Sequence, residues 1–468
     1  MKWSLTLFPV GLLIVVVIAC QSVADRVLVK IKEGSTAIWL TDVTIFNGKD
    51  SVLIPHQQVL IKDGFIRQIT DTLPDVDERT ATMIDASGKT LMPGLIDAHV
   101  HLSGSGAVPW ENIAANPDYN LSAYLYAGIT TVYDLGGMAK DISQLAEKVE
   151  QGELLGPTVY HTHLPITVKN SHPVPLAQTM LPWPLKSLAN TITPTIDQAA
   201  EAPDIIQKYS ERGVDYVKIA CDQIPSGSPE MSLEQLRALI DEAHRLNKKV
   251  FVHVGSPENA VNAVRAGADV LAHGIWRGEL SPAQADTIAS YRVPIIYTLA
   301  GFHNVSQINQ GAFYPSPLDA YLVDERILSP VSGEKGKYVR TQAVMNRFFA
   351  DVEHHKQYWQ HNFTLLHQRK VPMAVGTDSN LPGTYAGSTY FQELNLLQAY
   401  GLSTFEVLRA ATYRNATLFL DDPDFGTVEE GKKANLLLLD GDPLKNLKLL
   451  QDPAMIIMDG KIIERSSI

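Results

Sequence analysis

Short apolar runs alternate with amphipathic stretches through the middle of the chain, from about residue 94 to residue 419. The runs are rich in β-branched and aromatic residues, as expected of buried strands, whereas residues 233–246 and 259–266 repeat apolar positions with helical spacing. Counted with the strand before His99, the runs number eight, the others being 129–133, 158–160, 214–219, 250–253, 269–273, 293–297 and 373–377. Eight strands alternating with helices predict an α/β fold of the (β/α)8 TIM-barrel type.

The two flanks of this region have a different pattern. Residues 26–92 form short alternating runs separated by turn residues, and the same pattern returns in residues 434–440 and 455–462. We interpret 26–92 plus 420–468 as one small, discontinuous β-sandwich domain, and 93–419 as the barrel domain.

The first 24 residues have the pattern of a targeting signal, because Lys2 is followed by an apolar run from Leu5 to Cys20. The run is shorter than the roughly 20 apolar residues that usually span a bilayer, although a retained anchor stays an alternative. Its end resembles the lipobox of bacterial lipoproteins, in which the cysteine, here Cys20, is lipidated. Ordinary cleavage after Ala24 is the competing interpretation. Either route places the mature protein outside the cytoplasm, in a bacterial periplasm, with lipid attachment to the membrane as one outcome.

Composition narrows the classes of function. The chain has 468 residues, 45% of them hydrophobic, enough for a large core. Only two cysteines occur, and Cys20 lies in the signal, so Cys221 has no intramolecular partner after processing. The net charge of -12 and the lack of long basic runs argue against a nucleic-acid partner. A small molecule or short peptide is the expected partner, and the oligomeric state is open.

Polar residues stand at the ends of several predicted strands. His99 and His101 alternate around Val100, His253 and His273 end two further strands, and Asp378 follows the last. The carboxyl ends of barrel strands carry the active site in such folds. A single histidine at a strand end is usually a surface or core residue, but four with an aspartate favour a metal site.

Lys218 lies inside an apolar strand, with Tyr216 and Ala220 on its own face. Burial disfavours an ammonium and lowers the pKa of a lysine. The neutral amine can then react with CO₂ to form a carbamate, N6-carboxylated lysine, which is an anionic oxygen ligand. The alternative is a lysine whose amine reaches solvent or an acidic neighbour.

With these motifs the chain closely resembles the amidohydrolase superfamily. The resemblance rests on His99-Val100-His101, on Lys218 in strand four, on His253 and His273 after strands five and six, on Gly376-Thr377-Asp378 after strand eight, and on the tail 426–435. It implies two divalent metal ions: His99, His101 and Asp378 would hold one, His253 and His273 the other, and carboxylated Lys218 with a hydroxide would bridge them. The tail has Ala434-Asn435 where the family usually has Ala-Asp.

Nitrogen and oxygen ligands favour zinc, which lowers the pKa of a bound water and polarises a carbonyl. We expect Asp378 to act as the catalytic general base and acid, taking a proton during attack and delivering it to the leaving amine. A purely ligating role for Asp378 is the alternative.

Two residues are candidate substrate contacts. His172 follows strand three, where the imidazolonepropionase-like branch often carries Gly-Gly-His, and Tyr297 ends strand seven, where its hydroxyl could bind a carbonyl oxygen. Either is as readily an ordinary loop or packing residue. The stretch 301–362 is longer than a normal connection and predicts a lid or pocket wall.

The preferred function is therefore that of an exported binuclear amidohydrolase cutting an amide-type C–N bond, with a small Xaa-Pro peptide as the favoured substrate. The alternative is a mononuclear deaminase or imidazolonepropionase-like cyclic amide hydrolase. Deaminases of the superfamily usually carry a glutamate soon after the strand-five histidine, and here Glu258 comes only after Pro257. A non-catalytic binding lipoprotein is the distant third interpretation.

Overall fold

The computed structural model describes residues 26–34, 37–72, 81–108, 111, 113–137, 139–180, 186, 189–341 and 343–467. The predicted signal, residues 1–24 with Cys20, lies outside the described residues. Within the described ranges, no helix is both long enough and apolar enough to cross a membrane.

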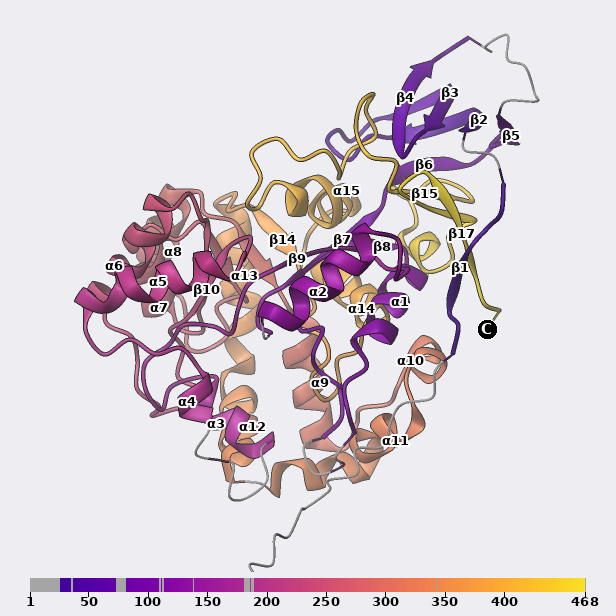
Figure 1. Cartoon of the computed structure of the whole chain (residues 1–468). Helices are drawn as coiled ribbons and strands as arrows, with labels where there is room; N and C mark the ends of the chain where they lie inside the picture. The colour runs from indigo at the N-terminus through magenta and orange to yellow at the C-terminus, as the bar shows by residue number, and fades with distance from the viewer. Residues whose placement is uncertain are drawn as a thin grey trace, which may run out of the picture.

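Parallel strands form the centre of the molecule and make two sheets (Figure 1). The three-stranded sheet has the order β7 (Leu95–Val100), β8 (Ile129–Asp134) and β9 (Thr158–His161). The five-stranded sheet has the order β10 (Val217–Ala220), β11 (Val250–His253), β12 (Val270–Ala272), β13 (Ile295–Tyr297) and β14 (Met373–Val375). Each predicted run therefore contains a strand, and the chain has an α/β fold.

The edges of the two sheets meet at both junctions. A parallel bridge pairs Ile166, beyond β9, with Ile219 of β10, and another pairs Val100 of β7 with Ser379, beyond β14. One apolar cluster also collects side chains from all eight strands or from residues next to them: Ile96, Tyr133, Tyr160, Tyr216, Phe251, Val270, Ile296 and Ala374. Closure of the strands into one barrel stays a prediction, because regular pairing forms two separate sheets.

Helices follow the parallel strands along the chain (Figure 1). They are α1 (Pro117–Tyr126), α2 (Ala139–Glu150), α3 (Val174–Met180), α4 (Ala189–Ile192), α5 (Ala202–Glu211), α6 (Leu233–Arg245), α7 (Pro257–Ala266), α8 (Pro282–Tyr291), α14 (Ser388–Ala399) and α15 (Thr404–Arg409). The long stretch after β13 is helical too, and consists mainly of α9 (Leu299–Gln310), α10 (Pro317–Leu322), α11 (Glu325–Leu328), α12 (Ala343–His355) and α13 (Trp359–Gln368). The connection of 301–362 therefore packs as structured helices.

Helix α7 shows how local sequence sets an element boundary. The Ser256 hydroxyl accepts a hydrogen bond from the Asn259 backbone N–H, and Pro257 occupies the first turn. Gly267 ends the helix in the left-handed region, with φ of 100°. The helix thus begins two residues before the start predicted from apolar spacing, at a cap only three residues beyond His253.

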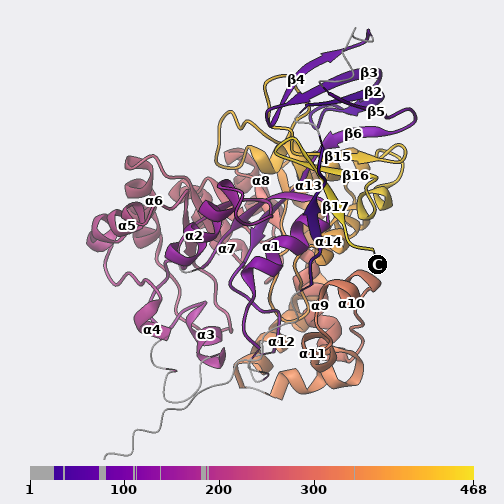
Figure 2. The same cartoon turned by 45° about the vertical axis from the view of Figure 1, so that its right-hand side comes forward.

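The two flanks combine in one nine-stranded sheet (Figure 2). Its strands run in the order β1 (Val29–Ile31), β17 (Lys461–Arg465), β16 (Met455–Met458), β15 (Leu436–Leu439), β6 (Thr90–Pro93), β2 (Ala37–Phe46), β3 (Leu53–Lys62) and β4 (Phe65–Thr70), and β5 (Thr82–Asp85) pairs with β2. Indigo strands from the N-terminal flank and yellow strands from the C-terminal flank lie side by side in both views. The pairing gives one sheet, so a sandwich of two sheets stays a prediction, as do the domain boundaries.

Strand β15 separates two cores. Leu436 and Leu438 belong to the apolar cluster of the flanking sheet, whereas Leu437 and Leu439 belong to the large cluster shared with the central strands and helices. Side chains alternate along a strand, so four consecutive leucines serve both faces. The shared cluster fixes the flanking sheet against the α/β region.

Candidate metal and active site

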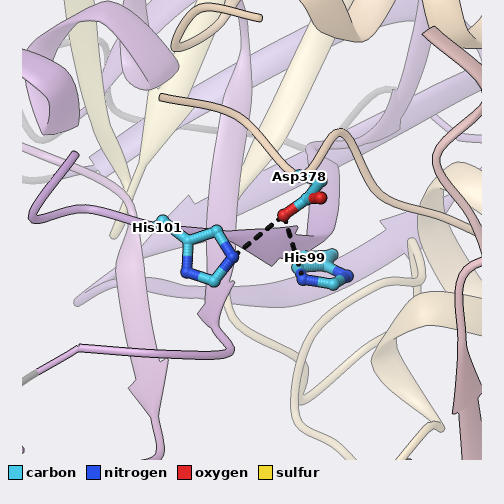
Figure 3. A group of neighbouring side chains, drawn as sticks. All are labelled: His99, His101 and Asp378. Atoms are coloured by element: carbon cyan, nitrogen blue, oxygen red, sulfur yellow. Dashed lines mark ion pairs between the residues drawn. The ribbon is translucent and has the colours of Figure 1, made fainter. Parts of the chain in front are cut away.

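Three predicted ligands meet where β7 and β14 end. Nε2 of His101 lies 2.9 Å from Oδ1 of Asp378, and Nε2 of His99 lies 3.3 Å from the same oxygen. One ligand atom from each of the three residues lies within 4.8 Å of the other two. Figure 3 shows both imidazoles directed toward the carboxylate. We call His99, His101 and Asp378 the first half of the site.

Backbone contacts hold the first half together. The Asp378 N–H donates to the His99 carbonyl over 2.8 Å, although the two residues stand 279 positions apart in the sequence. A Cβ on Gly376 would lie 2.6 Å from Cβ of His99, so only glycine allows this approach. Asp378 itself has φ of 54°, in the left-handed region, which carries backbone strain at the site.

A buried carboxyl group, Asp97, supports the same junction. Its oxygens accept hydrogen bonds from the Thr377 hydroxyl over 2.6 Å, from the Thr377 N–H over 3.0 Å and from the His99 N–H over 3.2 Å. Burial raises the pKa of Asp97 to about 7. Asp97 was not among the predicted site residues, although it stands two residues before His99 in the same motif.

The other predicted ligands adjoin the first half and form the second half of the site: Lys218, His253 and His273. The His273 ring centroid lies 4.6 Å from that of His99 and 4.3 Å from that of His253. The Lys218 amine is buried and, within the described residues, has no hydrogen-bond partner. The structure therefore brings the four predicted histidines and Asp378 together, and Lys218 is close enough for its charge to lower the pKa of His99 and of His253.

Outer partners set the orientation of three of these imidazoles. Nδ1 of His101 lies 3.2 Å from the Gly136 carbonyl, and Nδ1 of His273 lies 2.8 Å from the Thr298 hydroxyl. In both rings Nε2 is left for a ligand. His253 uses the opposite nitrogen, since its Nε2 lies 3.4 Å from Asp222, which leaves Nδ1. Histidines that bind metals commonly have one nitrogen engaged in this way.

The electrostatics favour neutral His99 and His253, the form of imidazole that binds metals. The pKa of His101 is instead raised, because burial lowers it less than the contact with Asp378 raises it. Burial, and then the charge of Lys218, lower the pKa of His99 well below its ordinary value and that of His253 to about 3. Burial likewise lowers the pKa of Lys218 to about 7. Burial would raise the pKa of Asp378, but the adjacent His99 and His101 hold it well below its usual range.

The two predicted substrate contacts differ in placement. The His172 ring lies 4.6 Å from that of His253, so His172 joins the cluster. Tyr297 instead belongs to the large cluster outside the strands and packs at 4.8 Å against Phe363 of α13. Its neighbour Ile296 faces the interior, and alternation along β13 turns Tyr297 away. The structure does not bring Tyr297 together with the histidines.

The helical insertion contributes an aromatic side chain to the surroundings of the site. Phe302 of α9 lies edge-on to His273 at 6.2 Å and stacks at 5.0 Å on Trp276. Residues 301–362 thus border the site through α9, whereas a lid that opens and closes stays a prediction.

The residues fit divalent metal ions. The donor set consists of imidazole nitrogens and a carboxylate, outer partners leave one nitrogen of His101, His253 and His273 available, and the orphaned Lys218 amine points to a missing partner. A model of the amidohydrolase family matches residues 90–304 and 356–463, more than half of the chain. The chain belongs to the amidohydrolase family. It is a hydrolase acting on C–N bonds, which sets aside the interpretation as a non-catalytic binding protein. The unmatched residues 305–355 of the family alignment fall inside the helical insertion.

Similar proteins carry the names of several different enzymes. The solved structure of a prolidase complexed with N-methylphosphonate-L-proline has the same fold, with a TM-score of 0.73 at 22% identity, covering 92% of this chain and 100% of that one. Ochratoxinase of Aspergillus niger is 23% identical over 398 residues, 78% of this chain and 73% of its own length. Imidazolonepropionase of Caldanaerobacter subterraneus subsp. tengcongensis is 23% identical over 421 residues, 84% of this chain and 85% of its own.

Proposed function

We propose that this amidohydrolase uses two divalent metal ions, zinc by preference, to hydrolyse the amide bond of a small peptide of the Xaa-Pro type. The observation that carries the proposal is the contiguous cluster in which His99 and His101 face Asp378 while His273 and His253 continue the row of imidazoles. The prolidase of the same fold supports the substrate class.

In this proposal the first half of the site would hold one ion, and His253 with His273 would hold the other. Lys218, carboxylated on its amine, would supply an anionic oxygen ligand. The buried, unpartnered Lys218 amine and its lowered pKa support the modification, because a neutral amine reacts with CO₂ and a carbamate supplies the anion that the second half lacks.

The bound ions supply Lewis acidity, which lowers the pKa of the attacking water and polarises the scissile carbonyl. Asp378 moves the protons. Its Oδ1 faces Nε2 of both His99 and His101, and the side chain is partly open to solvent, so it can accept a proton from the water and later donate it to the leaving amine. We assign a substrate contact to His172, and its position beside His253 supports this assignment.

The proposal includes the fold and the location of the protein. Bridges at both sheet junctions and the shared interior cluster support closure of the eight strands into a (β/α)8 barrel, with the site at the carboxyl ends. The apolar run up to Cys20 supports export to a bacterial periplasm, with or without a lipid anchor.

A second candidate is a mononuclear cyclic amide hydrolase. The imidazolonepropionase relative covers most of the chain, and the three ligands of the first half suffice for one ion. The number of bound ions and the state of Lys218 separate the two candidates.

The deciding experiment is elemental analysis of protein prepared with zinc and bicarbonate, together with the mass of the Lys218 peptide under non-acidic conditions. The proposal expects about two ions per chain, a carbamate-sized mass increment, and turnover of an Xaa-Pro dipeptide panel. One ion with an unmodified lysine would favour the mononuclear candidate. The variant His361→Ala, at an exposed histidine outside the site, serves as the matched control.

A further inference from the structure

Asp222 is a fully buried carboxylate that connects the ends of three neighbouring strands. It stands two residues after β10, and its partners come from His253 at the end of β11 and from the loop after β12. Burying a charge costs free energy unless partners compensate it, so the groups that contact Asp222 decide whether it can stay ionised.

The donors around Asp222 are specific. Oδ2 lies 3.2 Å from the Trp276 indole N–H and 3.4 Å from Nε2 of His253. Oδ1 accepts from the Gln223 N–H over 2.7 Å and pairs with the Arg277 guanidinium at 3.2 Å. One oxygen thus serves the imidazole and the indole, and the other is neutralised by arginine.

The Asp222 carboxylate packs directly against the backbone at Gly255, where any side chain would collide with it. A Cβ on Gly255 would lie 2.0 Å from Oδ2 of Asp222. The Gly255 carbonyl in turn accepts from the N–H groups of Trp276 and Arg277, over 3.1 and 2.9 Å. The segment just after His253 is therefore built around the Asp222 side chain and its two partners.

The contact selects one tautomer of His253. An ionised carboxylate only accepts hydrogen bonds, so Nε2 must carry the proton and Nδ1 must be the free nitrogen. Carboxylates that orient a ligating histidine also raise its basicity as a ligand. Trp276 extends the arrangement to the insertion, since its carbonyl accepts from the Trp359 indole and its ring stacks on Phe302.

We propose that Asp222 is a positioning residue for the second half of the site: it holds His253 with Nδ1 free for the metal ion, and Arg277 and Trp276 hold Asp222. This inference rests on the proposed metal role of His253. It assigns a function to a residue that touches neither substrate nor metal, and it predicts a defect confined to one of two ions.

The test titrates metal-free protein with Zn²⁺ in bicarbonate and follows Co²⁺ substitution by visible absorption. Four chains are compared: the parent, His253→Ala, Asp222→Asn and, as a matched control, Asp319→Asn, which alters a buried aspartate of α10 that accepts a hydrogen bond from Ser388. We expect Asp222→Asn to weaken one of the two ions about 10- to 100-fold and leave the other unchanged. His253→Ala should lose that same ion, and Asp319→Asn should match the parent.

Two results would overturn the inference, and they differ in what else they overturn. If His253→Ala loses one ion while Asp222→Asn binds both with the parent's affinities, the positioning role fails and the proposed function stands. If His253→Ala retains both ions, the metal role of His253 fails and this inference fails with it.

A milder variant covers the case in which Asp222→Asn does not fold. Trp276→Phe removes one donor from Oδ2 while the carboxylate and its arginine partner remain. A smaller loss of affinity at the same ion supports the positioning role, and unchanged affinity for both ions overturns it.

Discussion

The two halves of the candidate site are assembled by different forces. In the first half a carboxylate contacts two imidazoles directly, so ligands and compensating charge are already together. The second half consists of two imidazoles and an amine. Among the described residues, none forms a hydrogen bond with that amine, and the order of this half comes from outer partners such as Thr298. The first half can hold its geometry alone, whereas the second half needs an added anion to balance a divalent ion.

Metal binding in the two halves should therefore depend differently on CO₂. An ion in the first half is balanced by Asp378, which already contacts both imidazoles, so this half should keep its ion without added CO₂. The second half depends on a modification of Lys218 that needs CO₂ and a neutral amine.

Asp378→Asn should be the most damaging single change. It removes the negative charge that faces His99 and His101 as well as the group that moves protons, so turnover should fall by about 10²- to 10⁴-fold. The ion of the first half should be lost too. Steady-state turnover and metal content check this, with Asp442→Asn, in a surface turn, as the control. Retained turnover with both ions bound would contradict the role given to the first half.

Lys218→Ala should act on the second half. We expect the loss of one ion and a fall in turnover of about 10²-fold, because the bridging anion is absent. Acetate or propionate, added with zinc, should partly restore both, since a small carboxylate can occupy the space vacated by the side chain. The exposed Lys445→Ala is the control. If Lys218→Ala bound two ions without added carboxylate, the second half would not need an anion from Lys218.

Thr298→Val should weaken the second half only mildly. The change removes the hydroxyl that lies 2.8 Å from Nδ1 of His273 and preserves the shape of the side chain. We expect about tenfold weaker binding of one ion, the lower end for loss of a partner to a ligating histidine. Zinc titration measures it, and Thr287→Val, on the exposed side of α8, is the control. An equal loss of both ions would place Thr298 in support of the whole site.

Glu393→Gln should have the smallest effect, on the pH dependence of stability. This buried carboxyl accepts the Ala300 N–H over 2.6 Å, at the start of the helix that follows Thr298, and burial raises its pKa to about 8. Between its unfolded pKa and about 8 the folded state holds a proton that the unfolded chain releases. The free energy of unfolding therefore falls as pH rises, by up to about 1.4 kcal/mol per pH unit from this group.

The neutral amide keeps the acceptor and removes the titration, so Glu393→Gln should flatten that fall. Urea unfolding from pH 5 to pH 9 measures the slope, and Glu153→Gln, at an exposed position, is the control. Parallel curves for the parent and Glu393→Gln would show that Glu393 does not titrate in this window.

Much of the fold could be predicted because strand and helix periods are local properties. All eight predicted runs contain strands, and β11 has the predicted bounds. Boundaries deviated where a cap or a backbone turn decided, as at Ser256 and at His273, where φ of 71° ends the strand one residue early. The two-sheet pairing in the centre and the single sheet of the flanks depend on long-range hydrogen bonds that no local period contains.

By itself, the sequence determined which candidate ligands stand in or directly after the central strands. Histidine, lysine and aspartate at strand ends have few other reasons to recur, and the order of strands brings such ends together. The orientation of Tyr297 could also have been predicted from the sequence, because the neighbours Ile296 and Tyr297 must lie on opposite faces of a strand.

Only the tertiary structure decided how those residues are held. Val270 and Ala272 face the interior, so strand alternation alone would turn His273 outward, and its left-handed φ redirects the ring toward His99. The proposed role of Asp222 could be inferred only from the fold, because the indole that donates to it lies 54 residues away in the chain. Hydrogen bonds and burial depend on distance in space. The supporting partners of a site can therefore be identified only when folding brings donor and acceptor atoms from remote segments within about 3 Å of one another.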